Sequence, residues 1–286
     1  MNAAARAGAV HNKAIGSIIR ELRDLSADQI EQILDYQRRN HLRFGEAAVA
    51  LQLASADDVL EALSRQFHYP YVTESGHQRP ELVALTRPFS AQAESFRALR
   101  SQLMLRIYGS RETRRAVAVV SAEPGAGKTF VAANLAVTLA QLGGRTLLVD
   151  ADMRNPRLHE VFQIDNTTGL SAILSGRTEH KAVQQIDDIP ALFVVAVGAT
   201  PPNPLELIER PAFGLLMNEL VAKFDHVIVD TPAVARGTDA TVIAARCGAA
   251  IVVARRNESR LGPLRTLVHA LQDNVEKVLG VAFNDH

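Results

Sequence analysis

The feature that most constrains the fold is a glycine-containing segment that joins a short apolar run to a longer apolar stretch. This segment, residues 121–129, reads Ser-Ala-Glu-Pro-Gly-Ala-Gly-Lys-Thr. The apolar residues 116–121 before it have the Val-rich composition of a central parallel strand. Residues 128–142 after it have the length and composition of a helix. A strand, a glycine-rich turn and a helix in this order predict a phosphate-binding loop at a helix N-terminus.

Each residue type in the loop has a role toward a nucleotide. The glycines let backbone N–H groups approach phosphate oxygens, Lys128 can reach the β- and γ-phosphates, and the Thr129 hydroxyl can bind magnesium. ATP and Mg²⁺ are therefore the expected cofactors. The expected nucleotide-binding residues are Gly125, Ala126, Gly127, Lys128, Thr129, Phe130 and Arg154.

Short runs rich in Val and Ile alternate with helical stretches over the rest of the chain. The predicted strands are 116–121, 145–150, 192–197, 226–230, 249–254 and 278–283. Helices are predicted between them, for example over 128–142 and 260–272. Such alternation predicts an α/β fold, a doubly wound and mostly parallel sheet of the P-loop NTPase type.

Three aspartates follow predicted strands. Asp150 and Asp152 come at the end of 145–150, and Asp230 ends 226–230. Ligands bind at the carboxyl ends of the strands in such sheets, so we expect these acids to converge with Lys128 in one crevice. Carboxylates there can hold a hard cation and accept a hydroxyl proton. The expected magnesium ligands, direct or through water, are Thr129, Asp150, Asp152 and Asp230. The expected catalytic residues are Lys128, Asp150, Asp152 and Asp230.

The N-terminal part contains an internal repeat. Residues 16–37 align without a gap with 45–66, at an offset of 29. Each copy has a serine, Ser26 or Ser55, that can cap a helix with apolar residues at helical spacing. This pattern predicts a small helical domain of two helix–turn–helix units over 12–71.

Composition excludes several classes of protein. Lys plus Arg and Asp plus Glu number 31 each, so the chain lacks the basic character expected of a nucleic-acid-binding protein. The single Cys247 excludes a disulfide scaffold. No apolar run reaches the roughly 18 residues of a membrane helix, and the N-terminus is a poor signal peptide. These features predict a cytoplasmic protein, with a linker over 72–90 and a nucleotide-binding domain over 91–286.

At its acidic and phosphate-binding motifs, the sequence resembles the bacterial tyrosine kinases, which are P-loop proteins of the MinD-like branch. Asp150, Asp152 and Arg154 match the family's hydrophobic-Asp-x-Asp-x-Arg motif, and residues 155–159 also resemble the family. In the predicted helix 91–107, the family's Glu-x-x-Arg-x-x-Arg motif is matched by Glu94, Arg97 and Arg100. In the family this helix assembles rings, which implies a homo-oligomer.

The sequence also resembles, more narrowly, the cytoplasmic chain-length-determinant kinases of exopolysaccharide gene clusters, the EpsG type. The resemblance implies an ATP-dependent protein tyrosine kinase that regulates exopolysaccharide synthesis, chain length or export. It implies a partner, the cytoplasmic segment of a membrane chain-length determinant (a polysaccharide co-polymerase), which would hold the kinase at the inner membrane. In this reading Asp150 accepts the tyrosine proton.

The N-terminal repeat resembles the N-terminal domain of type II secretion ATPases. Some members of that family bind cyclic di-GMP through two repeats that contain Arg-Leu-Gly. Here the second copy has Arg43-Phe44-Gly45, whereas the first has Ala14-Ile15-Gly16 and lacks the arginine. Cyclic di-GMP binding and a protein-docking role are the two alternatives for this domain.

Two departures bear on the activity. The family usually ends in a cluster of tyrosines, whereas residues 281–286 contain none, so we expect a phosphorylation target in trans. The four tyrosines are Tyr36, Tyr69, Tyr71 and Tyr108.

The alternative function is that of a MinD- or ParA-like ATPase, an assembly switch without tyrosine phosphorylation. That branch places a lysine where this chain has Glu123, which favours the kinase.

Overall fold

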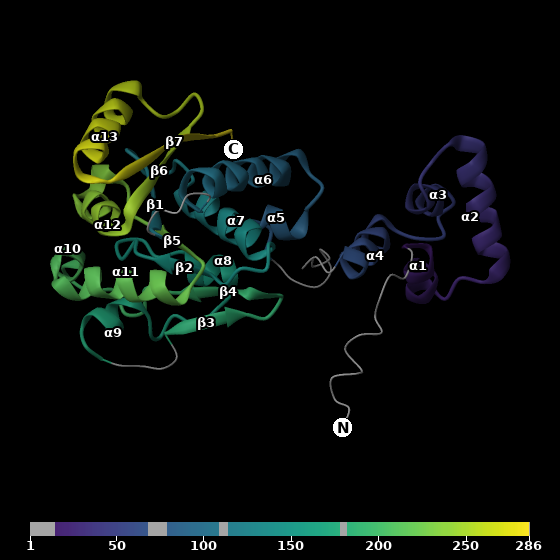
Figure 1. Cartoon of the computed structure of the whole chain (residues 1–286), viewed down its shortest axis with the longest axis horizontal. Helices are drawn as coiled ribbons and strands as arrows, with labels where there is room; N and C mark the ends of the chain where they lie inside the picture. The colour runs from purple at the N-terminus through teal and green to yellow at the C-terminus, as the bar shows by residue number, and fades with distance from the viewer. Residues whose placement is uncertain (1–14, 68–78, 109–113, 178–181, 286) are drawn as a thin grey trace. The chain divides into compact units, whose positions relative to one another are not determined.

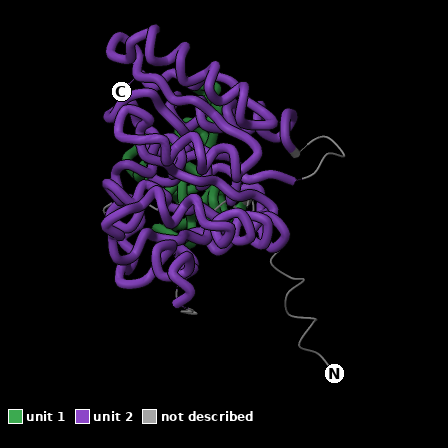
Figure 2. Tube along the Cα trace, turned by 90° about the vertical axis from the view of Figure 1, so that its left-hand side faces the viewer, with its two compact units in different colours: residues 1–78 green, residues 79–286 purple. Residues whose placement is uncertain are grey.

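The computed structural model describes residues 15–67, 79–108, 114–177 and 182–285. The chain divides into two compact units, Met1–Gln78 and Arg79–His286, which Figure 2 shows in different colours. Each unit has its own core and is described by itself.

The first unit is the predicted pair of helical repeats. Its helices are α1 (Ile15–Arg23), α2 (Ala27–Asn40), α3 (Phe44–Ala50) and α4 (Ala56–Phe67). The expected N-caps are present: Ser26 Oγ accepts the Gln29 N–H at 3.2 Å, and Ser55 Oγ accepts the Asp58 N–H at 3.1 Å. The apolar faces of both repeats meet in one core, in which Ile19 and Ile33 are fully buried.

The second unit contains a seven-stranded sheet in the order β3-β4-β2-β5-β1-β6-β7 (Figure 1). The strands are β1 (Ala116–Val120), β2 (Thr146–Asp150), β3 (Val183–Ile186), β4 (Ile189–Val195), β5 (His226–Asp230), β6 (Gly248–Arg255) and β7 (Lys277–Asn284). Only β3 is antiparallel to its neighbour. The α/β fold class and all six predicted strands are confirmed. The sequence did not indicate β3, because this short edge strand is largely exposed and contains two glutamines.

Helices cover both faces of this sheet. They are α5 (Val83–Thr86), α6 (Ala91–Leu103), α7 (Lys128–Ala140), α8 (Leu158–Phe162), α9 (Leu170–Leu174), α10 (Pro204–Glu209), α11 (Pro211–Lys223), α12 (Asp239–Cys247) and α13 (Leu261–Asn274). A π-helical turn, Met104–Tyr108, continues α6. Helix α7 is buried along almost its whole length against the central strands, so the loop before it has a fixed position. None of the helices in the described part of the chain combines the length and apolar character needed to cross a membrane.

The predicted linker over 72–90 is wrong in its second half. Residues 79–90 belong to the second unit, and Leu82, Val83 and Leu85 are buried there. Asn134 of α7 holds this segment: its Oδ1 accepts the Ala84 N–H at 2.9 Å and its Nδ2 donates to the Glu81 carbonyl at 2.8 Å. The remaining part, 72–78, lies outside the described residues. A segment that contains two prolines is thus part of the core of this unit, because its apolar side chains are buried and its backbone is hydrogen-bonded to helix α7.

Candidate active site

The loop between β1 and α7 has the backbone of a phosphate cradle. Gly125 and Gly127 adopt φ of 78° and 90°, a left-handed region in which side chains other than glycine are strained. α7 begins at Lys128, so its N-terminal N–H groups and positive dipole end lie at the loop. A pocket of about 230 Å³ opens here. Its lining residues are Pro124, Gly125, Gly127, Lys128, Thr129, Phe130, Asp152, Asn155, Arg157, Ala233 and Arg236.

Most of the predicted nucleotide-binding residues are therefore brought together. Ala126 does not line the pocket and is 2% exposed. Phe130 lines it, and its ring packs edge-on against that of Phe96 with centroids 5.5 Å apart. Lys128 is buried, and this burial lowers its pKa, whereas the carboxylates of Asp230 and Asp152 raise it. A poorly hydrated ammonium group at the pocket wall is suited to bind phosphate oxygens.

Thr129 and Asp230 form the centre of the expected magnesium site. Thr129 Oγ1 donates a hydrogen bond to Asp230 Oδ2 at 2.6 Å. The other carboxylate oxygen, Asp230 Oδ1, is buried without a hydrogen-bond partner. Burial raises the pKa of Asp230 to about 7, against the opposing effects of the Thr129 hydrogen bond and the Lys128 charge. A hydroxyl beside a carboxylate oxygen that lacks a partner fits a hard cation such as Mg²⁺.

Asp150 and Asp152 have different surroundings. Asp150 is completely buried, and its carboxylate accepts N–H groups from Asp152, Arg157 and Leu158 at 3.2, 3.1 and 3.0 Å. Burial chiefly raises its pKa well above the usual range. Asp152, by contrast, lines the pocket. Burial also raises the pKa of Asp152, opposed by the backbone N–H groups of Asn155 and Arg154 and by Lys128.

The expected aspartates lie near one another, since the charges of Asp230 and Asp152 both act on Asp150, and those of Lys128 and Asp152 act on Asp230. Within the described ranges, no three His, Cys, Asp or Glu side chains are close enough to hold a metal ion together. The structure instead places Thr129 with Asp230, Asp152 at the pocket wall and Asp150 behind the loop that follows β2. A magnesium ion here would take its remaining ligands from phosphate and water, as is usual for this ion.

Arg154 occupies a different place from the one expected for a nucleotide ligand. Its guanidinium pairs with the buried carboxylate of Asp239, with three N···O distances of 3.1 to 3.2 Å, and it does not line the pocket. The charge pair draws Arg154 toward the start of α12. Two lining arginines had no predicted role: Arg157, which lies in a motif that resembles the family, and Arg236, which no motif marked.

Glu123 faces a partner within its own chain. Its carboxylate accepts hydrogen bonds from the Arg260 backbone N–H at 3.1 Å and from Arg260 Nε at 2.7 Å. The Arg260 contacts lower the pKa of Glu123. A carboxylate at this position cannot supply positive charge to the phosphates of a neighbouring subunit.

The arginines of α6, the helix predicted to assemble rings, form contacts within their own unit. Arg97 pairs with Glu94 at 2.9 Å and also donates to the Pro88 carbonyl. Arg100 donates to the Thr138 carbonyl of α7 at 2.8 Å. The Glu94 side chain remains 70% exposed. Both arginines thus fix α6 in this chain, and Glu94 is the member of the motif that is most available to a neighbour.

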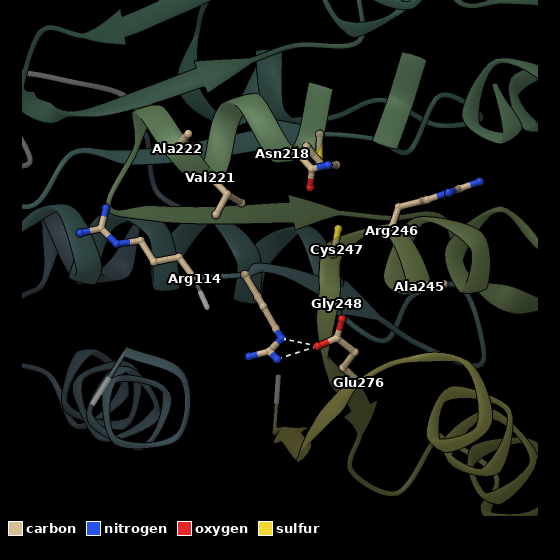
Figure 3. Close-up of a pocket in the computed structure, with 11 residues that line it drawn as sticks. Arg114, Asn218, Val221, Ala222, Ala245, Arg246, Cys247, Gly248 and Glu276 are labelled. Carbon is tan, nitrogen blue, oxygen red and sulfur yellow. Dashed lines mark hydrogen bonds and ion pairs between the residues drawn. The ribbon is translucent and has the colours of Figure 1, made fainter. Parts of the chain in front are cut away.

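A larger pocket, of about 540 Å³, lies at the opposite edge of the sheet, where β1 and β6 begin (Figure 3). Arg115 and Glu276 form an ion pair at 2.6 Å in its wall. Cys247 lies there too, but it is 4% exposed, and burial raises the pKa of its thiol. This pocket contains none of the residues of the phosphate loop.

The fold and the site define a P-loop nucleotide-binding protein. The family model for the CobQ/CobB/MinD/ParA nucleotide binding domain matches residues 117–286. The tyrosine-protein kinase YwqD of Bacillus subtilis (strain 168) is 32% identical over 204 residues, which are 71% of this chain and 85% of that protein. The chain therefore belongs to the bacterial tyrosine kinases within this nucleotide-binding family.

Other comparisons agree with this assignment. EpsB of Ralstonia nicotianae is 39% identical over 209 residues, which are 73% of this chain. The match spans only 28% of the length of that relative. The kinase domain of the Escherichia coli tyrosine kinase ETK is 30% identical with a TM-score of 0.67, and the match covers 71% of this chain and 79% of that one. MinD of Pyrococcus horikoshii OT3, complexed with Mg-ADP, is 25% identical with a TM-score of 0.51, over 58% of this chain and 68% of that one.

Proposed function

We propose that this chain is an ATP-dependent protein tyrosine kinase that regulates the synthesis, chain length or export of an exopolysaccharide. The observation that carries the proposal is the Thr129–Asp230 pair beside Lys128, at a phosphate loop whose relatives are named tyrosine-protein kinases. The Mg-ADP complex of the related MinD supports a magnesium nucleotide as the ligand.

The residues divide the chemistry among them. Lys128 and the N–H groups at the start of α7 neutralise charge on the β- and γ-phosphates. Magnesium, held by Thr129 and Asp230, would neutralise the remaining phosphate charge. Asp152 is better placed than Asp150 to accept the tyrosine proton, because Asp152 lines the pocket whereas the oxygens of Asp150 are occupied by three backbone N–H groups.

The proposed partner is the cytoplasmic segment of a membrane chain-length determinant, which would hold the kinase at the inner membrane as a homo-oligomer. We assign the helical unit a protein-docking role rather than cyclic di-GMP binding. Arg43 is the N-cap residue of α3 in the second repeat, and the first repeat has no arginine at the matching place.

The test is incubation of the full chain with ATP and Mg²⁺, with and without the cytoplasmic segment of a chain-length determinant from the same gene cluster. Mass spectrometry then searches both proteins for phosphotyrosine. The proposal predicts phosphotyrosine with wild type and none with Lys128→Met. No phosphotyrosine under any of these conditions, in a protein that binds ATP, would contradict it.

A further inference from the structure

Arg236 differs from the other arginines around the nucleotide pocket. It is exposed and lines the pocket, yet it forms no ion pair with any residue that the structure describes. Its neighbours around the site are each held by a carboxylate. These pairs are Arg154–Asp239, Arg157–Glu81 and Arg260–Glu123. An arginine that lines a phosphate pocket without a carboxylate partner is suited to an anionic ligand.

The backbone that carries Arg236 is attached to the phosphate loop. Residues 234–236 form a 3-10 turn, which residues 231–233 connect to the strand that ends at Asp230. The Val234 N–H donates to the Ser121 carbonyl at 3.0 Å, and the Ala235 N–H donates to the Ala122 carbonyl at 2.9 Å. The turn therefore keeps a constant position relative to Lys128.

The Arg154–Asp239 ion pair packs closely against the other side of the turn. Gly237, next to Arg236, has φ of 153°, and a Cβ there would lie 2.5 Å from Asp239 Oδ2. Only glycine allows the chain to pass this close to the ion pair. Arg154, expected as a nucleotide ligand, thus positions the loop that presents Arg236 to the pocket.

We propose that Arg236 is a catalytic arginine that contacts the γ-phosphoryl group during transfer. The inference rests on the proposed function. In the transfer, the bond from the γ-phosphorus to the β–γ bridging oxygen breaks, and a bond from the tyrosine oxygen to the phosphorus forms. The tyrosine proton passes to Asp152, and ADP leaves. The guanidinium fork neutralises negative charge on the transferring oxygens, as arginines do in other phosphoryl-transfer enzymes. Arg236 is also close enough to influence Lys128 and Asp152 electrostatically.

The experiment compares the binding of Mg-ADP with that of Mg-ADP plus aluminium fluoride, which mimics the transferring phosphoryl group. The full chain is tested as wild type, Arg236→Ala and Arg246→Ala. Arg246 is a matched control, because it is exposed, has no ion pair in the described part of the chain and lies at the opposite pocket.

Arg236→Ala is expected to weaken binding of the fluoride complex on the order of 100-fold, with Mg-ADP affinity within about 3-fold of wild type. Arg246→Ala is expected to leave both affinities unchanged. Equal affinity of wild type and Arg236→Ala for the fluoride complex, or an equal loss for both ligands, would overturn the assignment. Because the measurement contains no tyrosine, failure of the proposed kinase function would be seen separately, as absence of phosphotyrosine.

Discussion

Thr129 Oγ1 and Asp230 Oδ2 are joined by a 2.6 Å hydrogen bond, although the two residues are 101 positions apart in the sequence. The register of the sheet creates this contact. Strand β5 pairs in parallel with β1, and Asp230 lies opposite Val119, near the point where the chain leaves the sheet for the phosphate loop. The two halves of the proposed magnesium site are thus fixed by neighbouring strands.

Magnesium binding should depend on pH through Asp230. Burial raises the pKa of this carboxyl to about 7, and the cation needs the ionised form. Affinity for Mg²⁺ in the presence of ADP should therefore fall about tenfold from pH 8 to pH 6, since about a tenth of the carboxyl is ionised one unit below its pKa. Calorimetric titration with Mg²⁺ at pH 8 and at pH 6 measures this change in affinity.

Asp230→Asn is the control for this prediction. The variant should bind Mg²⁺ weakly and should lose the part of the pH dependence that comes from Asp230, which leaves the smaller part that comes from the ADP phosphate. Without magnesium, the stability of the fold should change with pH in the opposite direction to the affinity for magnesium. Above about pH 4 the folded wild type keeps a proton on Asp230 that the unfolded chain has released, so the free energy of unfolding should decline as the pH rises toward 7. Equal pH dependence of wild type and Asp230→Asn would contradict the role given to Asp230.

Asn134 should contribute strongly to the stability of the second unit. Its buried side chain makes three hydrogen bonds, and Asn134→Ala leaves the Ala84 N–H without its acceptor. We expect a loss of about 1–3 kcal/mol in the free energy of unfolding, measured by denaturant titration. The control is Asn274→Ala, an exposed residue of α13, for which a change within about 0.5 kcal/mol is expected. Similar losses in both variants would show that residues 79–90 are not held as described.

The sequence predicted the parts of this fold that depend on local pattern. The six strands and the two capped helical repeats follow from apolar periodicity and from serines at helix starts, which are short-range signals. The placement of residues 79–90 could not be predicted in this way, because it depends on Asn134, far along the chain.

The same limit applies to the site. The phosphate loop and Asp230 were predicted because the ends of parallel strands meet at one edge. The sequence could not show that Arg154 turns to Asp239, because that pairing depends on how α12 is placed. Arg236 gave no signal, since its role comes from hydrogen bonds between its turn and residues 121–122.

Glu94 should affect assembly without loosening α6. Its side chain is 70% exposed, whereas Arg97 and Arg100 bind carbonyls of their own chain. Glu94→Lys should lower the particle mass measured by light scattering, because charge reversal opposes the contact with a neighbour. Gln102→Lys, elsewhere on the same helix, should not. Arg97→Ala with Arg100→Ala should lower both the mass and the melting temperature. An unchanged mass with Glu94→Lys would count against this helix as the interface.

The tyrosines of this chain should be minor targets. Tyr36 packs partly buried against the core of the helical unit, which restricts access of its hydroxyl to a kinase pocket. Tyr69 and Tyr71 lie outside the described residues. A variant with Tyr36, Tyr69, Tyr71 and Tyr108 changed to Phe should phosphorylate its partner at a rate close to that of wild type. Strong labelling of the wild type alone that disappears in the variant would show the target to be in cis.

The most direct test of the account is the ratio of phosphotyrosine formed to ADP released, with ATP, Mg²⁺ and the partner segment present. A kinase forms phosphotyrosine in step with ADP, whereas an assembly ATPase of the MinD or ParA kind releases ADP and free phosphate. We predict that both products accumulate together and that Lys128→Met lowers both on the order of 100- to 1,000-fold. Sustained release of ADP and phosphate without phosphotyrosine would contradict the assignment of this site as a tyrosine kinase.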